Sequence, residues 1–195
     1  MSKGRIEAFS DGVIAIIITI MVLELRAPHE ADLAALKPLL HEFLSYTLSF
    51  AFLGIYWNNH HHLFQAVKHV RGWVLWANLH LLFWLSLIPF ATSWMGEHPD
   101  APWPVAAYGF VLIACAMAYS LLVRTLLAHH APDSALALAI GGDFKGYASL
   151  AIYAVGLLLA FAQPLVAKLC YVVVALIWLR PDTRIERVLD ARHAE

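Results

Sequence analysis

Residues 5–23 read RIEAFSDGVIAIIITIMVL, and this stretch decides the fold. Four ionisable or polar side chains stand within residues 5–12, directly before an uncharged run from Gly12 to Leu23. Such a run is typical of a helix in a bilayer, where ionisable groups are costly. The polar groups at its start therefore have one of two tasks: they hold helices together, or they line an ion path.

The composition predicts an all-α integral membrane protein. Of the 195 residues, 61% are hydrophobic and 14% are charged, whereas a soluble domain usually carries about 25% charged residues. The formal net charge is −1, so no broad basic field favours nucleic acid as a partner. Cys115 and Cys170 both lie in apolar runs, which argues against a disulfide framework and against a zinc site. No nucleophile elbow, phosphate loop or metalloprotease pattern occurs, so we expect no enzyme.

Six segments can form transmembrane helices, because helices satisfy the backbone within lipid. They are Ile6–Leu25, Leu39–Trp57, Trp73–Trp94, Val105–Val123, Tyr147–Ala162 and Leu165–Leu179. A bilayer core needs about 20 helical residues, so the short segments must also use flanking residues. We expect residues 1–180 to form one six-helix transmembrane domain and residues 181–195 to form a charged cytoplasmic tail.

The distribution of lysine and arginine predicts that both termini are cytoplasmic. With six spans and the N-terminus inside, ten basic residues fall on the inner side: Lys3, Arg5, Lys68, Arg71, Arg124, Lys145, Arg180, Arg184, Arg187 and Arg192. Three fall outside: Arg26, Lys37 and Lys168. This is the positive-inside bias of a multi-pass protein. A signal peptide is the alternative for the first segment, but acidic Glu7 and Asp11 fit a signal poorly.

One face of the first helix is a candidate ion path. At 100° per residue its members are Ile16, Thr19, Ile20 and Leu23. Asp11 points about 140° away from Ile16. The ordinary interpretation of such a face is lipid contact or helix packing. The alternative is a pore lining, in which branched side chains form a dry constriction that gates by dewetting. A symmetric pore would require several copies of the chain around one axis.

Several motifs resemble those of the transmembrane protein 175 family of potassium channels. In the first helix they are Arg5, Phe9-Ser10-Asp11, Ile16 and Thr19. Further matches are Tyr56-Trp57-Asn58-Asn59-His60-His61 with Leu63-Phe64, then Trp76-Ala77-Asn78-Leu79 and Leu87-Ile88-Pro89-Phe90. A chain with a single six-helix repeat resembles the bacterial branch. The resemblance implies a homotetramer in the bacterial plasma (inner) membrane, with the first helix of each subunit lining a central pore.

The resemblance also implies roles for individual residues. Ile16 matches the position of the hydrophobic constriction, Thr19 the hydroxyl position that contributes to potassium preference, and Leu23 a further apolar pore position. Ile20 joins them from its helical face alone. The expected permeant ions are K+, Rb+ and Cs+, with no cofactor. Selectivity should be weak, because the sequence lacks the Thr-Val-Gly-Tyr-Gly filter of ordinary potassium channels.

We expect a polar network to hold the first helix in place. By the resemblance, Arg5 and Phe9-Ser10-Asp11 tie this helix to its neighbours rather than touching the ion. An unpaired polar group in hydrocarbon costs several kcal/mol, so His80 in the third span needs a partner as well. The expected members are Arg5, Phe9, Ser10, Asp11, Trp57, Asn58, Trp76 and His80.

Other functions stay open at this stage. Asp11 and His80 could form the relay of a proton-coupled secondary transporter. The eleven histidines could serve a cofactor or metal, but consecutive His60, His61 and His62 point 100° apart on a helix and cannot share one ion. We therefore expect no metal site. Glu24, Glu30 and Asp32 could form an acidic outer vestibule that concentrates cations, or simply a solvated loop.

Overall fold

The computed structural model describes residues 3–67, 70, 72–128 and 143–179. Within these residues the secondary structure is helical throughout. The elements are α1 (Lys3–Leu23), the short 3-10 helix η1 (Leu33–Leu36), α2 (Leu40–Gln65), α3 (Gly72–Leu85), α4 (Ile88–Glu97), α5 (Pro102–Leu127), α7 (Phe144–Leu159) and α8 (Pro164–Leu179). The expected tail, residues 181–195, lies outside the described residues.

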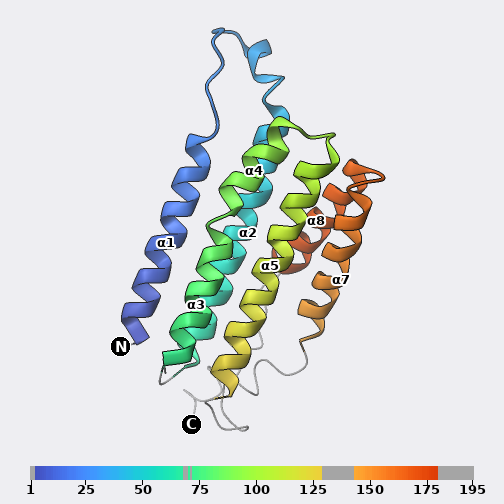
Figure 1. Cartoon of the computed structure of the whole chain (residues 1–195). Coiled ribbons are helices and arrows are strands. Elements are labelled where there is room, and N and C mark those ends of the chain that lie inside the picture. The colour runs from blue at the N-terminus through green and yellow to red at the C-terminus, as the bar shows by residue number, and fades with distance from the viewer. Residues whose placement is uncertain (1–2, 68–69, 71, 129–142, 180–195) are drawn as a thin grey trace.

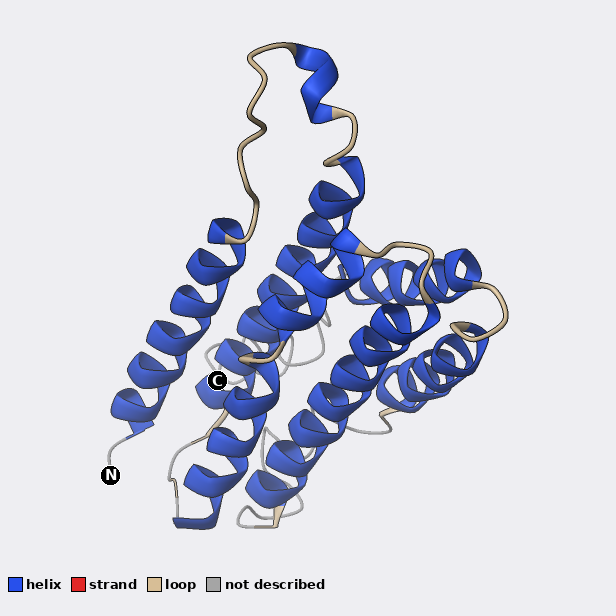
Figure 2. Ribbon diagram, turned by 45° about the horizontal axis from the view of Figure 1, so that its top comes forward, coloured by secondary structure: helices blue, strands red, loops and turns tan. Residues whose placement is uncertain are grey.

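The helices form one bundle in which α1 lies along one side (Figure 1). The long helices α2 and α5 and the stacked pair α3–α4 occupy the middle, and α7 and α8 pair on the opposite side (Figure 2). The segment that joins α1 to α2, residues 24–39, rises above the bundle at the end opposite to the start of α1 (Figure 1). Because α1 packs against α2, α3 and α4 from one side, its other side is bare in the single chain.

Three of the described helical segments are long and apolar enough to cross a membrane by themselves. They are α1, the α3–α4 pair over Gly72–Glu97, and α5. Helix α2 has 26 residues, but its serine, asparagine and histidine side chains make it less apolar. Helices α7 and α8 have 16 residues each, about 24 Å of helix, against a hydrocarbon core of about 30 Å. All six expected helical segments are present, and α2 continues eight residues beyond the expected end at Trp57.

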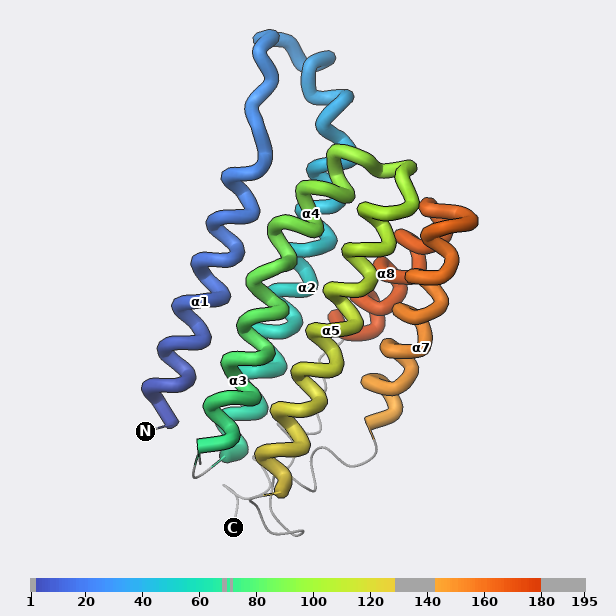
Figure 3. The backbone as a smooth tube through the Cα atoms, in the orientation of Figure 1, coloured from blue at the N-terminus to red at the C-terminus, as the bar shows by residue number. Residues whose placement is uncertain are grey.

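The third expected span is broken near its middle. Helix α3 ends at Leu85 and α4 begins at Ile88, with Pro89 in the first turn of α4. Proline lacks the N–H that would continue the helical hydrogen bonds, and its ring displaces the preceding turn. The Ser86 hydroxyl donates to the Phe83 carbonyl at 2.7 Å, which satisfies one acceptor at the break. The two helices remain stacked end to end as one bent rod (Figure 3).

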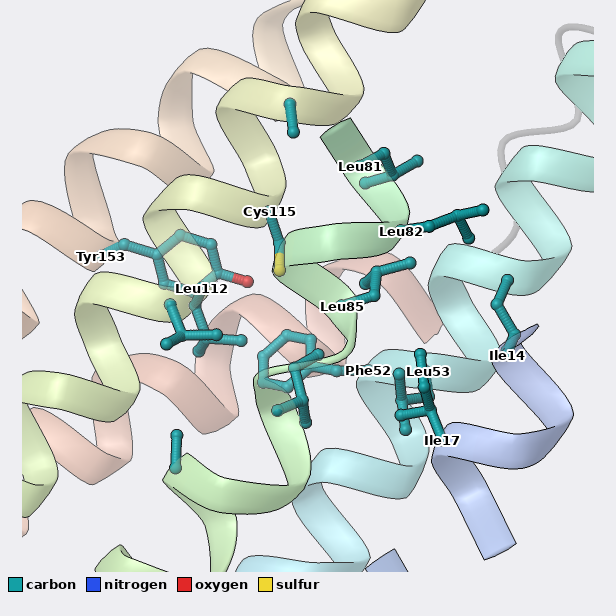
Figure 4. Close-up of a cluster of buried hydrophobic side chains, with 14 of the residues drawn as sticks. Ile14, Ile17, Phe52, Leu53, Leu81, Leu82, Leu85, Leu112, Cys115 and Tyr153 are labelled. Carbon is teal, nitrogen blue, oxygen red and sulfur yellow. The ribbon is translucent and has the colours of Figure 1, made fainter. Parts of the chain in front are cut away.

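The apolar core lies where the helices α1, α2, α3, α4, α5, α7 and α8 face one another. Figure 4 shows Ile14 and Ile17 of α1 beside Leu53 of α2, with Leu85 and Cys115 further inside. Cys115 is fully buried as a free thiol and acts as a small apolar side chain there. The core therefore packs against only one face of α1.

Small residues allow α5, α7 and α8 to approach closely. Tyr171 of α8 is fully buried, and its hydroxyl donates to the Val105 carbonyl of α5 at 3.2 Å. A Cβ atom added at Gly109 of α5 would stand 2.7 Å from Tyr171 Cζ, and one at Gly156 of α7 would stand 2.7 Å from Tyr171 Cε1. The two glycines thus make the space that the Tyr171 ring occupies.

We predict that Gly109→Ala destabilises the bundle by about 1–3 kcal/mol, because the new methyl group overpacks the Tyr171 ring. The measurement is the free energy of unfolding of purified protein in detergent. Gly54→Ala is the matched control, since a Cβ there meets nothing within 4 Å, and its effect should be neutral or slightly stabilising. Equal losses for the two variants would contradict the packing argument.

Candidate ion pathway and its anchoring network

Helix α1 has one buried face. Its members follow one another at intervals of three or four residues, as a single helical stripe requires. They are Ile6, Ser10, Ile14, Ile17 and Met21. Each is at most 4% exposed, so this stripe is the surface with which α1 packs on the bundle.

The four expected pore residues lie together on the exposed side of α1. The exposed fractions are 58% for Ile16, 45% for Ile20 and 77% for Leu23, and Thr19 is also exposed. Thr19 is about 180° around the helix from Ser10, at the centre of the bare side, and Ile16 is about 120° from Ser10. The structure therefore presents a continuous stripe, Ile16–Thr19–Ile20–Leu23, that the rest of the described chain leaves largely exposed.

Thr19 is the one polar side chain in this stripe. Its hydroxyl donates to the Ile16 carbonyl at 2.9 Å, so its proton is held against the helix backbone. A hydroxyl oxygen also carries two acceptor lone pairs. With the proton directed back along the helix, these lone pairs are free to face a cation.

A groove of about 570 Å³ runs beside the stripe, between α1 and α4. Ile16 and Ile20 form part of one wall, and Pro89 and Phe90 form part of the other. Glu24, just after α1, and Glu97, the last residue of α4, also line the groove, and the Ser93 hydroxyl donates to Glu24 Oε2 at 3.5 Å. The groove joins the apolar stripe to a small acidic region at the end of α1.

A buried chain of hydrogen bonds ties α1 to α2 and α3. Asn78 Nδ2 donates to Ser10 Oγ at 2.9 Å, and Asn78 Oδ1 lies 2.8 Å from His60 Nε2. An amide oxygen can only accept, so Nε2 of His60 carries the proton in this bond. The exposed fractions of Ser10, Asn78 and His60 are 0%, 2% and 1%. We call this set the Ser10–Asn78–His60 chain.

A second bond anchors the flank of α1. Trp57 Nε1 donates to Asp11 Oδ1 at 3.0 Å, in an exposed position. The Trp57 ring is stacked at 6.0 Å on His61, one turn further along α2. Asp11 therefore contacts the neighbouring helix, and it lies away from the stripe, as its position on the helical wheel indicated.

His80 does not take part in either set of bonds, which corrects the expected network and the expected relay with Asp11. It is exposed, and its Nε2 accepts from Trp84 Nε1 of its own helix at 3.0 Å. Asn78 and His80 are about 200° apart on α3, so only one of them can face α1. Asn78 does so, and the sequence interpretation chose the wrong neighbour.

The remaining expected network members lie at the surface of the single chain. Arg5 is exposed, Phe9 is 50% exposed and Trp76 is 69% exposed, while Asn58 is half-buried. Among the described residues, none of these four side chains makes a hydrogen bond that links α1 to another helix. The network within one chain thus consists of Ser10, Asn78 and His60, with Asp11–Trp57 beside it. Asn78 and His60 stood within the recognised motifs, but the sequence alone did not show that they meet.

The outer acidic residues have separate surroundings. Asp32 Oδ1 accepts from the backbone N–H of Ala35 at 2.9 Å, so Asp32 caps η1. Glu24 lines the groove beside α4, and Glu30 is exposed. Among the described residues, no group of three or more histidine, cysteine or acidic side chains could hold a metal ion.

Comparison with known proteins places these features in a family. Residues 5–89 match the family model described as "Endosomal/lysosomal potassium channel TMEM175". A Chryseobacterium protein named a potassium channel is 55% identical over 189 residues, which cover 97% of this chain and 98% of the relative. The human protein named endosomal/lysosomal proton channel TMEM175 is 34% identical over 84% of this chain, but over only 36% of its own length.

A solved structure has the same fold. The crystal structure of a lysosomal potassium-selective channel TMEM175 homologue from Chamaesiphon minutus aligns with a TM-score of 0.81 and 29% identity. The alignment covers 92% of this chain and 97% of that one.

We predict that Asn78→Ala lowers the free energy of unfolding by about 1–3 kcal/mol, because it leaves the buried His60 N–H without an acceptor. The measurement is thermal or denaturant unfolding in detergent. Asn58→Ala is the matched control, since Asn58 is half-buried on α2 outside the chain of bonds. If Asn58→Ala proved as costly as Asn78→Ala, the Ser10–Asn78–His60 chain would not be the anchor of α1.

Proposed function

The chain belongs to the TMEM175 family of ion channels, and from this premise we propose that it is a weakly potassium-selective cation channel. In this proposal four copies assemble around an axis in the bacterial inner membrane, and α1 of each copy lines the pore. The family consists of membrane channels with membrane-spanning helices, so the chain is not an enzyme.

One observation carries the proposal: the exposed Ile16–Thr19–Ile20–Leu23 stripe lies on the side of α1 that faces away from the rest of the described bundle. Apolar exposure by itself suits lipid as well as a pore. Thr19 favours the pore, because its hydroxyl oxygen faces outward from the same stripe. The Ser10–Asn78–His60 chain holds α1 so that this stripe must point away from the rest of its own bundle.

The mechanism follows from the order of the side chains along α1. A ring of Ile16 side chains would form a narrow dry neck that conducts only when it is wide enough for water. One turn further along, a ring of Thr19 oxygens would replace part of the hydration shell of a cation. Ile20 and Leu23 would continue the apolar lining towards the acidic end at Glu24. K+, Rb+ and Cs+ are the expected permeant ions, and no cofactor is needed.

The orientation is part of the proposal. Lys3 and Arg5 lie in the first turn of α1, Arg124 in the last turn of α5 and Lys145 in the first turn of α7, and these helix ends lie at the same end of the bundle (Figure 1). Lys37 comes just before α2, and Lys168 Nζ donates to the Pro99 carbonyl between α4 and α5, at the other end. The positive-inside rule then places both termini in the cytoplasm. In this orientation the Ile16 neck lies between the cytoplasm and the Thr19 ring.

Protons are the ion against which potassium must be tested. The bacterial relatives are named potassium channels, whereas the animal relatives are named proton channels. A proton-coupled carrier that uses Asp11 and His80 loses its basis, because Asp11 bonds Trp57 and His80 bonds Trp84.

Reversal potentials and ion fluxes of purified protein in planar bilayers distinguish a potassium channel from a proton-coupled carrier. A channel for potassium follows the potassium gradient at fixed pH, and a carrier shows saturable flux coupled to the pH gradient.

We predict that Ile16→Asn raises the single-channel conductance and abolishes most of the preference for K+ over Na+, because a polar ring wets and widens the neck. Single-channel recording in bilayers measures both quantities. Val22→Asn is the matched control: Val22 is 45% exposed on α1 but lies off the stripe, and its variant should conduct as the parent does. Unchanged conductance and preference in Ile16→Asn would remove Ile16 from the constriction.

We predict that Thr19→Val lowers the K+/Na+ permeability ratio with little effect on assembly, because the valine is the same size but offers no oxygen to the ion. Thr19→Ser keeps the oxygen and should keep most of the ratio. The readouts are the reversal potential under bi-ionic conditions and the elution volume of the oligomer. An equal loss of preference in both variants would mean that side-chain volume, and not coordination, sets the ratio.

A further inference from the structure

A second groove lies between α3 and α5, on a face that plays no part in the proposed pore. Its volume is about 590 Å³. Trp73, Trp76 and His80 line it from α3, and Leu121 and Arg124 line it from the last turns of α5. Figure 1 places the start of α3 and the end of α5 at the same end of the bundle as the start of α1.

Among the described residues that line this groove, Arg124 is the one that carries a positive charge. Arg124 is exposed, and its Nη2 donates to the Tyr147 hydroxyl of α7 at 3.3 Å, which steadies the guanidinium beside the groove. No acidic side chain lines the groove among the described residues. Two large indole rings, Trp73 at 75% exposure and Trp76 at 69%, stand opposite. Exposed tryptophan at the end of a transmembrane helix is typical of the lipid headgroup region.

Apolar side chains continue from the groove towards the middle of the bundle. On α5, Met117, Leu121 and Arg124 share one face at i, i+4 and i+7, and Met117 is 59% exposed. On α3, Phe83 lies on the same face as Trp76 and is 54% exposed. Met117 is about 10 Å from Arg124 along the helix, within the roughly 15 Å depth of one leaflet. The surface thus has a positively charged end, followed by a strip of apolar side chains that is long enough to contact part of an acyl chain.

We infer that the α3–α5 groove binds an anionic phospholipid. The phosphate contacts the Arg124 guanidinium and the headgroup lies between the tryptophans. Arginine suits a phosphate because its planar fork can make two parallel hydrogen bonds. One acyl chain lies along Leu121, Met117 and Phe83. The site belongs to the leaflet at the N-terminal end of α1, where the basic side chains gather, and anionic lipids are attracted to such ends.

The test uses the full chain in a neutral detergent and the short-chain lipid dioctanoyl phosphatidylglycerol. Dioctanoyl phosphatidylcholine and inorganic phosphate serve as the other two probes. The readout is the shift of the thermal-unfolding midpoint over a titration, which gives an apparent affinity for each probe. We expect the anionic lipid to bind more tightly than phosphatidylcholine, and phosphate alone to give no shift in the same range.

Arg124→Gln should weaken phosphatidylglycerol binding about fivefold and abolish the preference over phosphatidylcholine. The matched control is Lys3→Gln, which removes one positive charge at the same end of the bundle but on α1, where Lys3 Nζ donates to the Gln65 carbonyl at 3.4 Å. This control should keep the preference. Leu121→Trp provides an independent variant, because Leu121 is 47% exposed and a bulkier ring fills the groove without entering the core. It should weaken binding of both lipids.

Four results would overturn the inference. Equal affinity of the parent protein for the two lipids would remove the anion preference. If Lys3→Gln and Arg124→Gln weakened phosphatidylglycerol binding equally, the preference would come from the general surface charge and not from this groove. A comparable shift with inorganic phosphate would indicate an anion site without a lipid. Dissociation of the oligomer by Trp76→Ala, with lipid binding unchanged, would show that a second copy of the chain covers this face.

Discussion

The Ser10–Asn78–His60 chain sets the rotation of α1, and most of the remaining architecture follows from that rotation. Within a bilayer, apolar helices gain no hydrophobic energy by leaving lipid for one another, so packing and interhelical hydrogen bonds decide how they meet. Ser10, Asn78 and His60 are buried and satisfy one another across three helices. A helix turned by one residue rotates about 100°, which would remove Ser10 from Asn78 and, in one of the two directions, move Ile16 from the bare side towards the bundle.

The two faces of α1 therefore follow from one constraint. The buried stripe of isoleucine and methionine needs only dense packing, which many apolar residues supply. The exposed stripe has no such partner within the chain, although it is equally apolar and reaches 77% exposure at Leu23. In the proposed pore, association of several copies would give this stripe a common lumen, and the anchoring chain would then determine which side chains face it. Ser10, and Asp11 through its bond to Trp57, would thus act on the proposed ion path indirectly, through the orientation of α1.

Periodicity and hydropathy were sufficient to predict the helices, but not their rotations. All six helical segments occur where expected, since long apolar runs leave few alternatives. The sequence placed the end of α2 too early, because His60 and its neighbours are polar. His60 is nevertheless buried, and its Nε2 bonds to Asn78 Oδ1. The break before Pro89 lies in a run that is uncharged throughout, so hydropathy did not mark it. The Ile16–Leu23 stripe was predictable because it lies on one helix. The pairing of Asn78 with Ser10 was not, because one sequence does not report the relative rotation of two helices.

The proposed pore explains why its selectivity should be weak. A filter of backbone carbonyls surrounds an ion with many fixed dipoles. Here the stripe offers one oxygen per chain, from Thr19, and that side chain can rotate about a single bond. An isoleucine neck contributes to selectivity in a different way, because any ion that enters it must lose part of its hydration shell. Dehydration costs more for smaller ions, so such a neck by itself ranks K+, Rb+ and Cs+ ahead of Na+. In this proposal the preference for K+ over Na+ depends on the width of the neck. The packing of α1 controls that width through Ser10, Asn78 and His60.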